Sequence, residues 1–282
     1  MGESLTTPIV TLRRPTIGVF DSGFGGLTVL KALLEIVPAA DYVYFGDTAR
    51  LPYGSKSVET VAKYAVEAAH FLESHSAQML VIACNTATAL ALDQITSGAH
   101  VPVIGVVEPG AQAASAATRN RKVIVIGTDA TVSSHAYRKA LESRGLEARE
   151  KACPLLVPLV EEGWIDHPVT KQVARIYLKE AFSDGFHEAD TMVLGCTHYP
   201  LLKPLLKRVT PGHVNIVDSA ESTAREVAAH FQQLVSAAES EERRSAPRLT
   251  FFATDSTEKF QRLGQRFLAH PIANVEHVDL KE

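Results

Sequence analysis

The sequence predicts an α/β protein made of two similar doubly wound domains with mainly parallel sheets and an active site in the cleft between them. Three observations lead to this prediction. Short β-branched runs alternate with longer amphipathic stretches from residue 17 to about residue 234. The runs are apolar throughout, as buried parallel strands should be. Several features of the first part of the chain recur about 110 residues later.

The elements can be assigned in order from these runs and stretches. Apolar runs predict strands, and amphipathic stretches rich in Ala, Leu, Glu and Lys predict helices. The predicted strands are residues 16–20, 42–45, 79–83, 103–107, 122–126, 155–160, 191–194, 214–217 and 249–253. The clearest predicted helices are residues 27–36, 58–74, 134–143 and 169–182.

An internal duplication gives the domain organisation. Four pairs of positions share nearly the same offset, and one pair aligns two of only three cysteines. The duplication makes residues 108–217 the second domain, and residues 1–107 plus 218–282 the first, with strand 249–253 added to its sheet. The pairs are Asp21 with Asp129 (129 − 21 = 108), Phe45 with Leu155 (155 − 45 = 110), Cys84 with Cys196 (196 − 84 = 112) and Glu108 with Asp218 (218 − 108 = 110).

Composition limits the classes of protein that fit. A length of 282 residues, 46% of them hydrophobic, is enough for two domains with their own cores. The net charge of −4 and the dispersed basic residues predict no nucleic-acid or membrane partner. No apolar run approaches the roughly 20 residues that span a bilayer. The cysteines lack CxxC or zinc-type spacing and the first residues lack a signal peptide's apolar core, so we expect reduced thiols in a cytoplasmic protein.

The strongest candidate chemistry belongs to two cysteines. Cys84 and Cys196 each follow a predicted buried strand and precede polar residues, Asn85-Thr86 and Thr197-His198. A thiol at such a strand end lies near backbone N–H groups and a helix dipole that stabilise a thiolate. Two thiols on opposite walls of a cleft suit racemisation at a carbon acid, in which one removes the α-proton and the other delivers a proton to the opposite face. The alternative is redox chemistry through a disulfide between them.

Glycines and polar side chains lie near other predicted strand ends. The string DSGFGG at residues 21–26 predicts a tight turn whose backbone amides can hold a carboxylate. It is not a dinucleotide fingerprint, because Thr28 stands where the third glycine would be. The turn at Tyr53-Gly54 offers a phenol and a close backbone approach.

Three single residues complete the interpretation. His198 lies two positions from Cys196 and is placed to tune that thiol or relay a proton. Glu161 is predicted to end a strand. Cys153 precedes a predicted strand and aligns with the apolar Val43, so we interpret it as structural.

These motifs resemble the glutamate racemases of the aspartate/glutamate racemase superfamily. The resemblance runs through nearly the whole chain in the family's order, and the strings DSGFGGL and PYG favour glutamate racemases over aspartate or hydantoin racemases. The strings that carry it are IGVFDSGFGGLTVL (17–30), YFGDTARLPYG (44–54), ACNTATA (83–89), VPLVEEG (157–163) and GCTHYPLL (195–202).

The resemblance implies interconversion of L- and D-glutamate without a cofactor or metal, supplying D-glutamate for peptidoglycan and cell shape, in a homodimer. It implies that Cys84 is the base acting on D-glutamate and Cys196 the base acting on L-glutamate, with Asp21 and His198 assisting. An aspartate racemase or a noncatalytic glutamate-binding protein remain the alternatives. The implied substrate-binding residues are Asp21, Ser22, Tyr53, Gly54, Asn85, Thr86, Glu161, Thr197 and His198.

Overall fold

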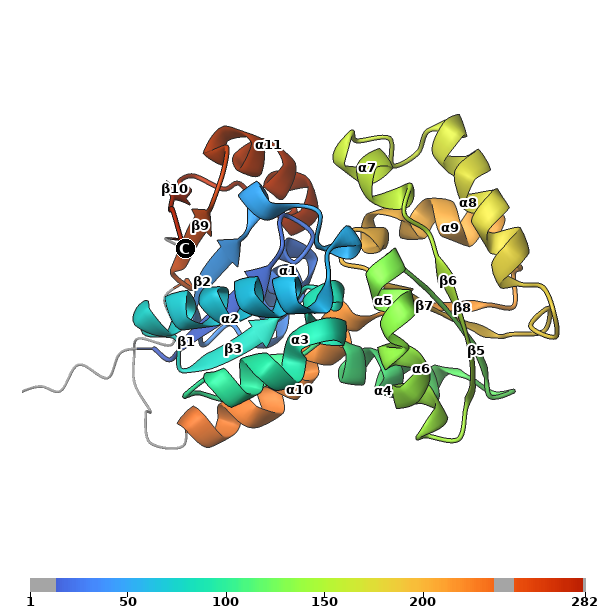
Figure 1. Cartoon of the computed structure of the whole chain (residues 1–282), viewed down its shortest axis with the longest axis horizontal. Helices are drawn as coiled ribbons and strands as arrows, with labels where there is room; N and C mark the ends of the chain where they lie inside the picture. Colours follow the sequence, from blue (N-terminus) through green and yellow to red (C-terminus); the bar gives the residue numbers. More distant parts are fainter. Residues whose placement is uncertain (1–13, 236–245, 281–282) are drawn as a thin grey trace, which may run out of the picture.

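Two parallel sheets organise residues 14–235 and 246–280, the part of the chain that the computed structural model describes (Figure 1). The larger sheet has six strands in the order β10-β9-β2-β1-β3-β4, and every pairing in it is parallel. Its strand β9 comes from near the end of the chain, as predicted. The strands are β1 (Thr16–Asp21), β2 (Asp41–Gly46), β3 (Met79–Ile82), β4 (Val103–Gly105), β9 (Leu249–Ala253) and β10 (Glu276–His277).

The smaller sheet has four strands in the order β6-β5-β7-β8, again all parallel. Its strands come from the middle of the chain and form the other half of the molecule in Figure 1. These two sheets confirm the predicted α/β class, while the predicted domain boundaries at residues 107/108 and 217/218 stay a prediction. The strands are β5 (Lys122–Gly127), β6 (Glu147–Ala152), β7 (Thr191–Gly195) and β8 (Asn215–Asp218).

Helices cover both faces of the larger sheet because its strands are apolar on both sides. Ile17 and Val19 belong to the same core cluster as Leu30 of helix α1, whereas Phe20, the next residue, belongs to the cluster on the other face, with Leu72 of α2. The helices are α1 (Leu27–Ile36), α2 (Val58–Ser74), α3 (Asn85–Gly98), α4 (Val107–Ala117), α5 (Asp129–Ser134), α6 (Ala136–Glu142), α7 (Leu156–Glu161), α8 (Pro168–Ala181), α9 (Lys203–Val209), α10 (Ser219–Val235) and α11 (Thr257–Leu268).

The strand registers support the duplication for the two cysteines. Phe20 pairs with Ile82 in the larger sheet, and Ile126 pairs with Leu194 in the smaller one. Phe20 and Ile126 are equivalent positions of β1 and β5 (126 − 20 = 106), and Cys84 and Cys196 each lie two residues after the partner of that position (84 − 82 = 2; 196 − 194 = 2). The two thiols therefore occupy equivalent strand ends.

The other three pairs of the predicted duplication are not equivalent. The offset between β1 and β5 is 122 − 16 = 106, so Asp21 corresponds to Gly127 and not to Asp129. The offset between β2 and β6 is also 147 − 41 = 106, which excludes Leu155 as the counterpart of Phe45. Glu108 lies in α4 whereas Asp218 ends β8. The segments between strands differ in length in the two halves, so no single offset aligns all equivalent positions.

The predicted strand at residues 155–160 is wrong, since this segment forms helix α7. Leu156 and Val160 are buried and four residues apart, which is helical spacing. The real strand, β6, has the polar sequence EAREKA because it lies at the edge of its sheet and is only partly buried. Consequently Glu161 ends a helix, and Cys153 follows a strand instead of preceding one.

Smaller differences occur at element ends. The predicted strand 103–107 stops at Gly105, because residues from Val107 onward already belong to α4. The predicted helix 134–143 is two short helices, interrupted at His135, whose φ of 55° is left-handed. Predicted helices 27–36 and 58–74 coincide with α1 and α2.

Candidate active site

A cavity of about 400 Å³ lies between the carboxyl ends of the two sheets. Segments following β1 and β3 line one side, and segments following β5 and β7 line the other. Of the predicted site residues, only Asp21 is outside its lining. The predicted residues that line it are Ser22, Tyr53, Gly54, Cys84, Asn85, Thr86, Glu161, Cys196, Thr197 and His198.

Cys84 is the N-cap residue of α3. Its Sγ accepts a hydrogen bond from the N–H of Ala87 at 3.5 Å and donates one to Ser22 Oγ at 3.5 Å. Burial nevertheless raises the pKa of Cys84 to about 12, and the negative charge of Asp21 adds to the rise. The helix N-terminus alone does not make this thiol a resting thiolate, contrary to the sequence-based expectation.

Cys196 has a different neighbour, the imidazole of His198. The Cys196 Sγ lies 3.9 Å from His198 Nδ1, and His198 Nε2 lies 3.2 Å from Glu161 Oε1. Burial lowers the pKa of His198, but hydrogen bonds to Cys196 and Glu161 outweigh it and raise that pKa to about 10. A protonated imidazole therefore lies beside the thiol, between two groups that carry negative charge when ionised.

Asp21 lies beneath the cavity. Its carboxylate accepts hydrogen bonds from the Gly23 N–H at 2.8 Å and from Thr197 Oγ1 at 3.4 Å. Burial raises the pKa of Asp21, and the charge of His198 opposes that rise. Asp21 thus connects the turn after β1 with the segment after β7, and its predicted assistance to catalysis stays a prediction.

Gly25 explains why the turn after β1 is rich in glycine. A β-carbon at Gly25 would lie 2.1 Å from Thr197 Oγ1 and 2.6 Å from His198 Nδ1. No side chain fits there unless these two residues move. The turn therefore allows the close approach of the two sides of the site, a role that sequence reasoning assigned instead to carboxylate binding.

Hydroxyl and amide groups form much of the remaining wall. Thr86 Oγ1 lies 3.0 Å from Thr128 Oγ1, which brings together the two sides of the cavity. Asn85 Oδ1 accepts a hydrogen bond from Tyr137 at 2.7 Å. The Tyr53 hydroxyl donates to Asp47 Oδ2 at 2.5 Å, so this phenol is already engaged away from the thiols.

Sequence reasoning missed several lining residues. Thr128 and Asp129 begin α5, where the Thr128 side chain accepts a hydrogen bond from the Thr131 N–H. The threonine-aspartate pair directly after an apolar strand was the available signal. Val157 and Pro158 line the cavity from α7, and the incorrect strand assignment of that segment hid them.

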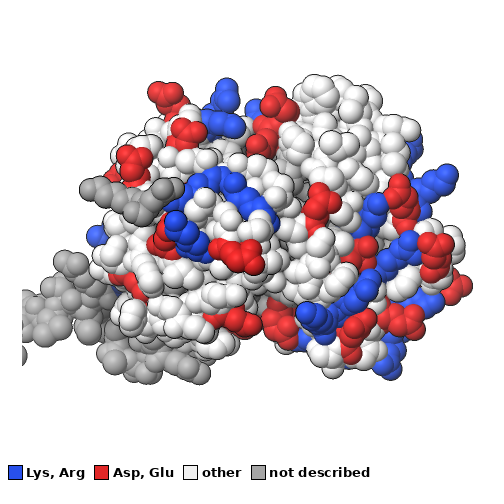
Figure 2. All heavy atoms as spheres, viewed as in Figure 1, with Lys and Arg blue, Asp and Glu red and all other residues white. Residues whose placement is uncertain are grey.

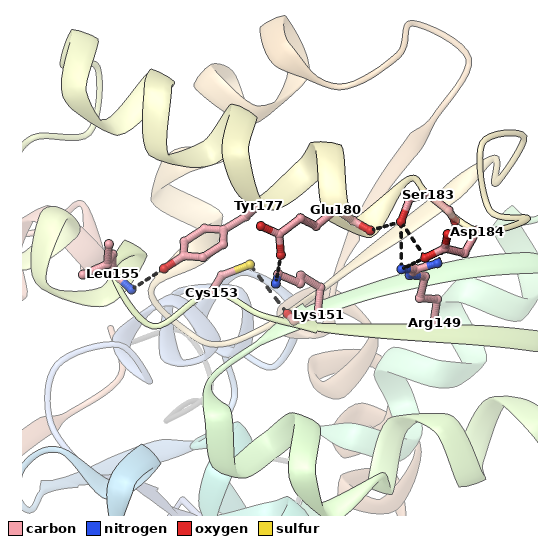
Figure 3. A network of polar contacts seen from close by, with 8 residues as sticks. All are labelled: Arg149, Lys151, Cys153, Leu155, Tyr177, Glu180, Ser183 and Asp184. Carbon is pink, nitrogen blue, oxygen red and sulfur yellow. Dashed lines mark hydrogen bonds and ion pairs between the residues drawn. The ribbon is translucent and has the colours of Figure 1, made fainter.

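Cys153 belongs to a separate polar network over β6 and α8 (Figure 3). Its Sγ is 3.6 Å from the Lys151 carbonyl oxygen, to which it donates, and burial raises its pKa to about 12. In the same network Arg149 pairs with Asp184, and the Tyr177 hydroxyl accepts from the Leu155 N–H. Cys153 is outside the cavity lining, in agreement with its interpretation as structural.

The described part of the chain shows neither a metal site nor a membrane-spanning helix. In residues 14–235 and 246–280, no group of three or more His, Cys, Asp or Glu side chains is arranged to hold a metal ion. None of the helices in these ranges has the length and apolar character needed to cross a membrane. All three cysteines are buried free thiols. On the face shown in Figure 2, basic and acidic side chains are mixed.

Comparison with known proteins places this site in a family. The sequence profile of the Asp/Glu/Hydantoin racemase family matches residues 17–227. A glutamate racemase of Koribacter versatilis is 60% identical, over 95% of this chain and 98% of the relative. A crystal structure of a glutamate racemase isoform from Bacillus anthracis superposes with a TM-score of 0.87 at 38% identity, covering 94% of this chain and 98% of that one.

A second crystal structure contains an amino acid. It is a glutamate racemase from Francisella tularensis in complex with D-glutamate, with a TM-score of 0.85 and 34% identity over 95% of this chain and 98% of that one. Together with the fold and the paired thiols, these matches show that the chain is an amino-acid racemase that belongs to the Asp/Glu/Hydantoin racemase family and, within it, to the glutamate racemases.

Proposed function

We propose that this enzyme interconverts L- and D-glutamate by a cofactor-independent, two-base proton transfer between Cys84 and Cys196. The observation that carries the proposal is that two free thiols at equivalent strand ends line one cavity from opposite sides. Glutamate is the substrate of this proposal because the chain is 60% identical to a glutamate racemase and resembles solved glutamate racemases, one of them with D-glutamate bound.

In the reaction, one thiolate takes the α-proton and becomes a thiol. The electron pair of the broken C–H bond stays on the α-carbon and is delocalised into the carboxylate. The opposite thiol then gives its proton to the other face of that carbon and becomes a thiolate. Each turnover inverts the configuration and exchanges the protonation states of the two sulfurs.

The neighbours of the two sulfurs suggest which of them acts first on L-glutamate. Burial and the negative charge of Asp21 raise the pKa of Cys84 to about 12, which keeps its thiol protonated and ready to donate. The Cys196 Sγ instead lies 3.9 Å from His198 Nδ1. In the proposed reaction Cys196 removes the α-proton of L-glutamate and Cys84 donates a proton to the opposite face.

The main energetic difficulty is that a thiolate is a much weaker base than the carbanion it creates. The site has to stabilise the developing charge by several kcal/mol or more. Suitable groups are the hydroxyls of Ser22, Thr86 and Thr197 and the amide of Asn85, all of which line the cavity. Because most are buried, water competes weakly for them.

The direct test is incubation of each glutamate enantiomer in deuterated water with wild type, Cys84→Ser and Cys196→Ser. We expect deuterium at the α-carbon of the inverted product for wild type and severe loss of racemisation in both variants. Full activity of either variant would contradict the two-thiol mechanism.

The two alternative functions predict other outcomes. Binding of glutamate without α-proton exchange would indicate a binding protein. A reversible Cys84–Cys196 disulfide, detected by mass spectrometry, would indicate redox chemistry.

Aspartate remains the alternative substrate. It has the same α-carbon chemistry and one methylene less, so the two thiols do not distinguish it. Comparison of kcat/KM for glutamate and aspartate under the same conditions decides between them. We expect glutamate to be preferred, and preference for aspartate would overturn the substrate assignment.

We place the enzyme in the cytoplasm, where its D-glutamate would enter peptidoglycan and support cell shape, and we propose a homodimer. Exposed apolar side chains on α8 and at the ends of α7 support the dimer: Leu155, Trp164, Val169 and Ile176 are each exposed by 43% or more of their surface. The part of the molecule where α7 and α8 lie in Figure 1 is largely free of charged side chains on the face that Figure 2 shows. Sedimentation should show a dimer that Trp164→Glu weakens, and a monomeric wild type would contradict it.

A further inference from the structure

Tyr137 is a fully buried residue of α6 that contacts segments next to both thiols. Its hydroxyl donates a hydrogen bond of 2.7 Å to Oδ1 of Asn85, the residue after Cys84. Its ring packs on Gly195, the residue before Cys196, where a β-carbon would lie 3.1 Å from Tyr137 Cε2. One side chain thus bridges the strand ends that carry Cys84 and Cys196.

The hydrogen bond to Tyr137 leaves the other end of the Asn85 amide available. The Asn85 side chain lines the cavity and only 3% of the residue is exposed. Its Nδ2 is buried, and no described residue hydrogen-bonds it. An unpartnered buried N–H donor is costly, and a carboxylate oxygen in the cavity would satisfy it.

The phenol also lies where the chain crosses between the two sheets. The crossings are made by α4 and α10, which pack on each other. A β-carbon on Gly110 of α4 would lie 3.0 Å from the Tyr137 hydroxyl oxygen and 3.2 Å from Cβ of Ser219, the first residue of α10. The two helices that connect the sheets, α4 and α10, therefore both lie close to this hydroxyl.

We propose that Tyr137 is a positioning residue that orients the Asn85 amide toward a substrate carboxylate and fixes the relative placement of the two thiol-bearing strand ends. The inference rests on the proposed function, because it requires glutamate to occupy the cavity. Tyr137 does not line the cavity and reaches it through Asn85 and Gly195.

The test is Tyr137→Phe in the full chain, which keeps the ring on Gly195 and removes only the hydroxyl. Released from its partner, the Asn85 amide can turn, and we expect KM for both glutamate enantiomers to rise about tenfold with a smaller change in kcat. Calorimetric binding of D-glutamate should weaken by a similar factor. Unchanged KM and binding would overturn the proposal.

A double-mutant cycle separates positioning from a general structural effect. If Tyr137 acts through Asn85, Tyr137→Phe should add little to the rise in KM already caused by Asn85→Ala. Additive effects of the two substitutions on KM would contradict that route.

A matched control is available in the same chain. Tyr42→Phe also removes a buried hydroxyl, one that donates to the carbonyl oxygens of Leu33 and Val37 away from the cavity, and it should leave KM unchanged. An equal rise of KM in Tyr42→Phe would overturn the proposal. If wild type binds glutamate but does not racemise it, the proposed function fails, while the binding comparison still tests Tyr137.

Discussion

The surroundings of Cys84 and Cys196 differ although the two strand ends are equivalent. Cys84 caps an α-helix of fourteen residues, yet burial and the Asp21 carboxylate dominate, and its pKa rises to about 12. Cys196 precedes only the short helix η3 (Tyr199–Leu202), and its neighbour is the His198 imidazole held by Glu161. Two equivalent strand ends therefore surround their sulfurs with different charged groups.

This difference means that two chemically identical side chains have different charged neighbours. A racemase needs one base and one acid at the start of each turnover. Two thiols in identical environments would have the same pKa, so neither would be favoured as the base that starts the reaction. The asymmetry is supplied by Asp21 near one sulfur and His198 near the other.

The largest expected effect comes from removing either sulfur. Cys84→Ala and Cys196→Ala should each lower racemisation by roughly a thousandfold or more, since in the proposed mechanism each removes an acid or base that both directions need. Cys196→Ala should retain slow α-proton exchange only with D-glutamate, and Cys84→Ala only with L-glutamate. Proton NMR in deuterated water measures both. Exchange with the opposite enantiomers would reverse the assignment of the two bases.

Gly25→Ala should lower kcat by about a hundredfold, because displacement of a catalytic group by about 1 Å has effects of that size. The new methyl group overlaps Thr197 and His198 on the Cys196 side. Alkylation rates followed by peptide mass spectrometry should change at Cys196 more than at Cys84. Gly212→Ala, where nothing lies within 4 Å of the new carbon, is the control. Equal activities of the two variants would remove the steric explanation.

Glu161→Gln should reduce kcat/KM by about tenfold, because it removes one of the groups that keep His198 protonated. The pKa of His198 falls from about 10, so the alkaline decline of activity should begin at lower pH. The two enantiomers have equal free energies, so kcat/KM must fall equally in both directions. An unshifted alkaline limb would show that Glu161 does not control this imidazole.

The His198–Glu161 pair also predicts that the free energy of unfolding depends on pH. The folded pKa of His198, about 10, is above its ordinary 6.5, so the protonated form favours the folded chain. This stabilisation is fully present below pH 6.5 and is lost as pH rises through 10. Chemical unfolding should therefore show a smaller stability difference between wild type and His198→Gln at pH 10 than at pH 6. A constant difference would contradict the raised pKa.

The smallest effect is expected at the third cysteine. Cys153→Ala removes a buried sulfur outside the cavity, which should cost about 1 kcal/mol of unfolding free energy and change kcat/KM less than twofold. Thermal melts and steady-state kinetics provide the comparison. A large loss of activity without loss of stability would mean that Cys153 takes part in catalysis.

The fold was largely accessible from local sequence patterns. Strands such as β1 and β3 are apolar on both faces because helices cover both sides of their sheet, so the apolar runs located them well. The pattern failed at β6, a partly exposed edge strand of polar residues, and at α7, whose apolar run is helical. An apolar run indicates that a segment is buried. It therefore does not identify an edge strand, which is only partly buried.

The sequence by itself determined the two-sheet α/β architecture and the equivalent positions of Cys84 and Cys196, because strand ends and buried runs are local properties. Tertiary structure alone decided which charged groups lie near each sulfur, the approach of Gly25 to His198 and the bridge made by Tyr137. These depend on burial and on distances between residues far apart in the chain. Coulomb forces and steric contacts act through space, so no spacing in the sequence encodes them.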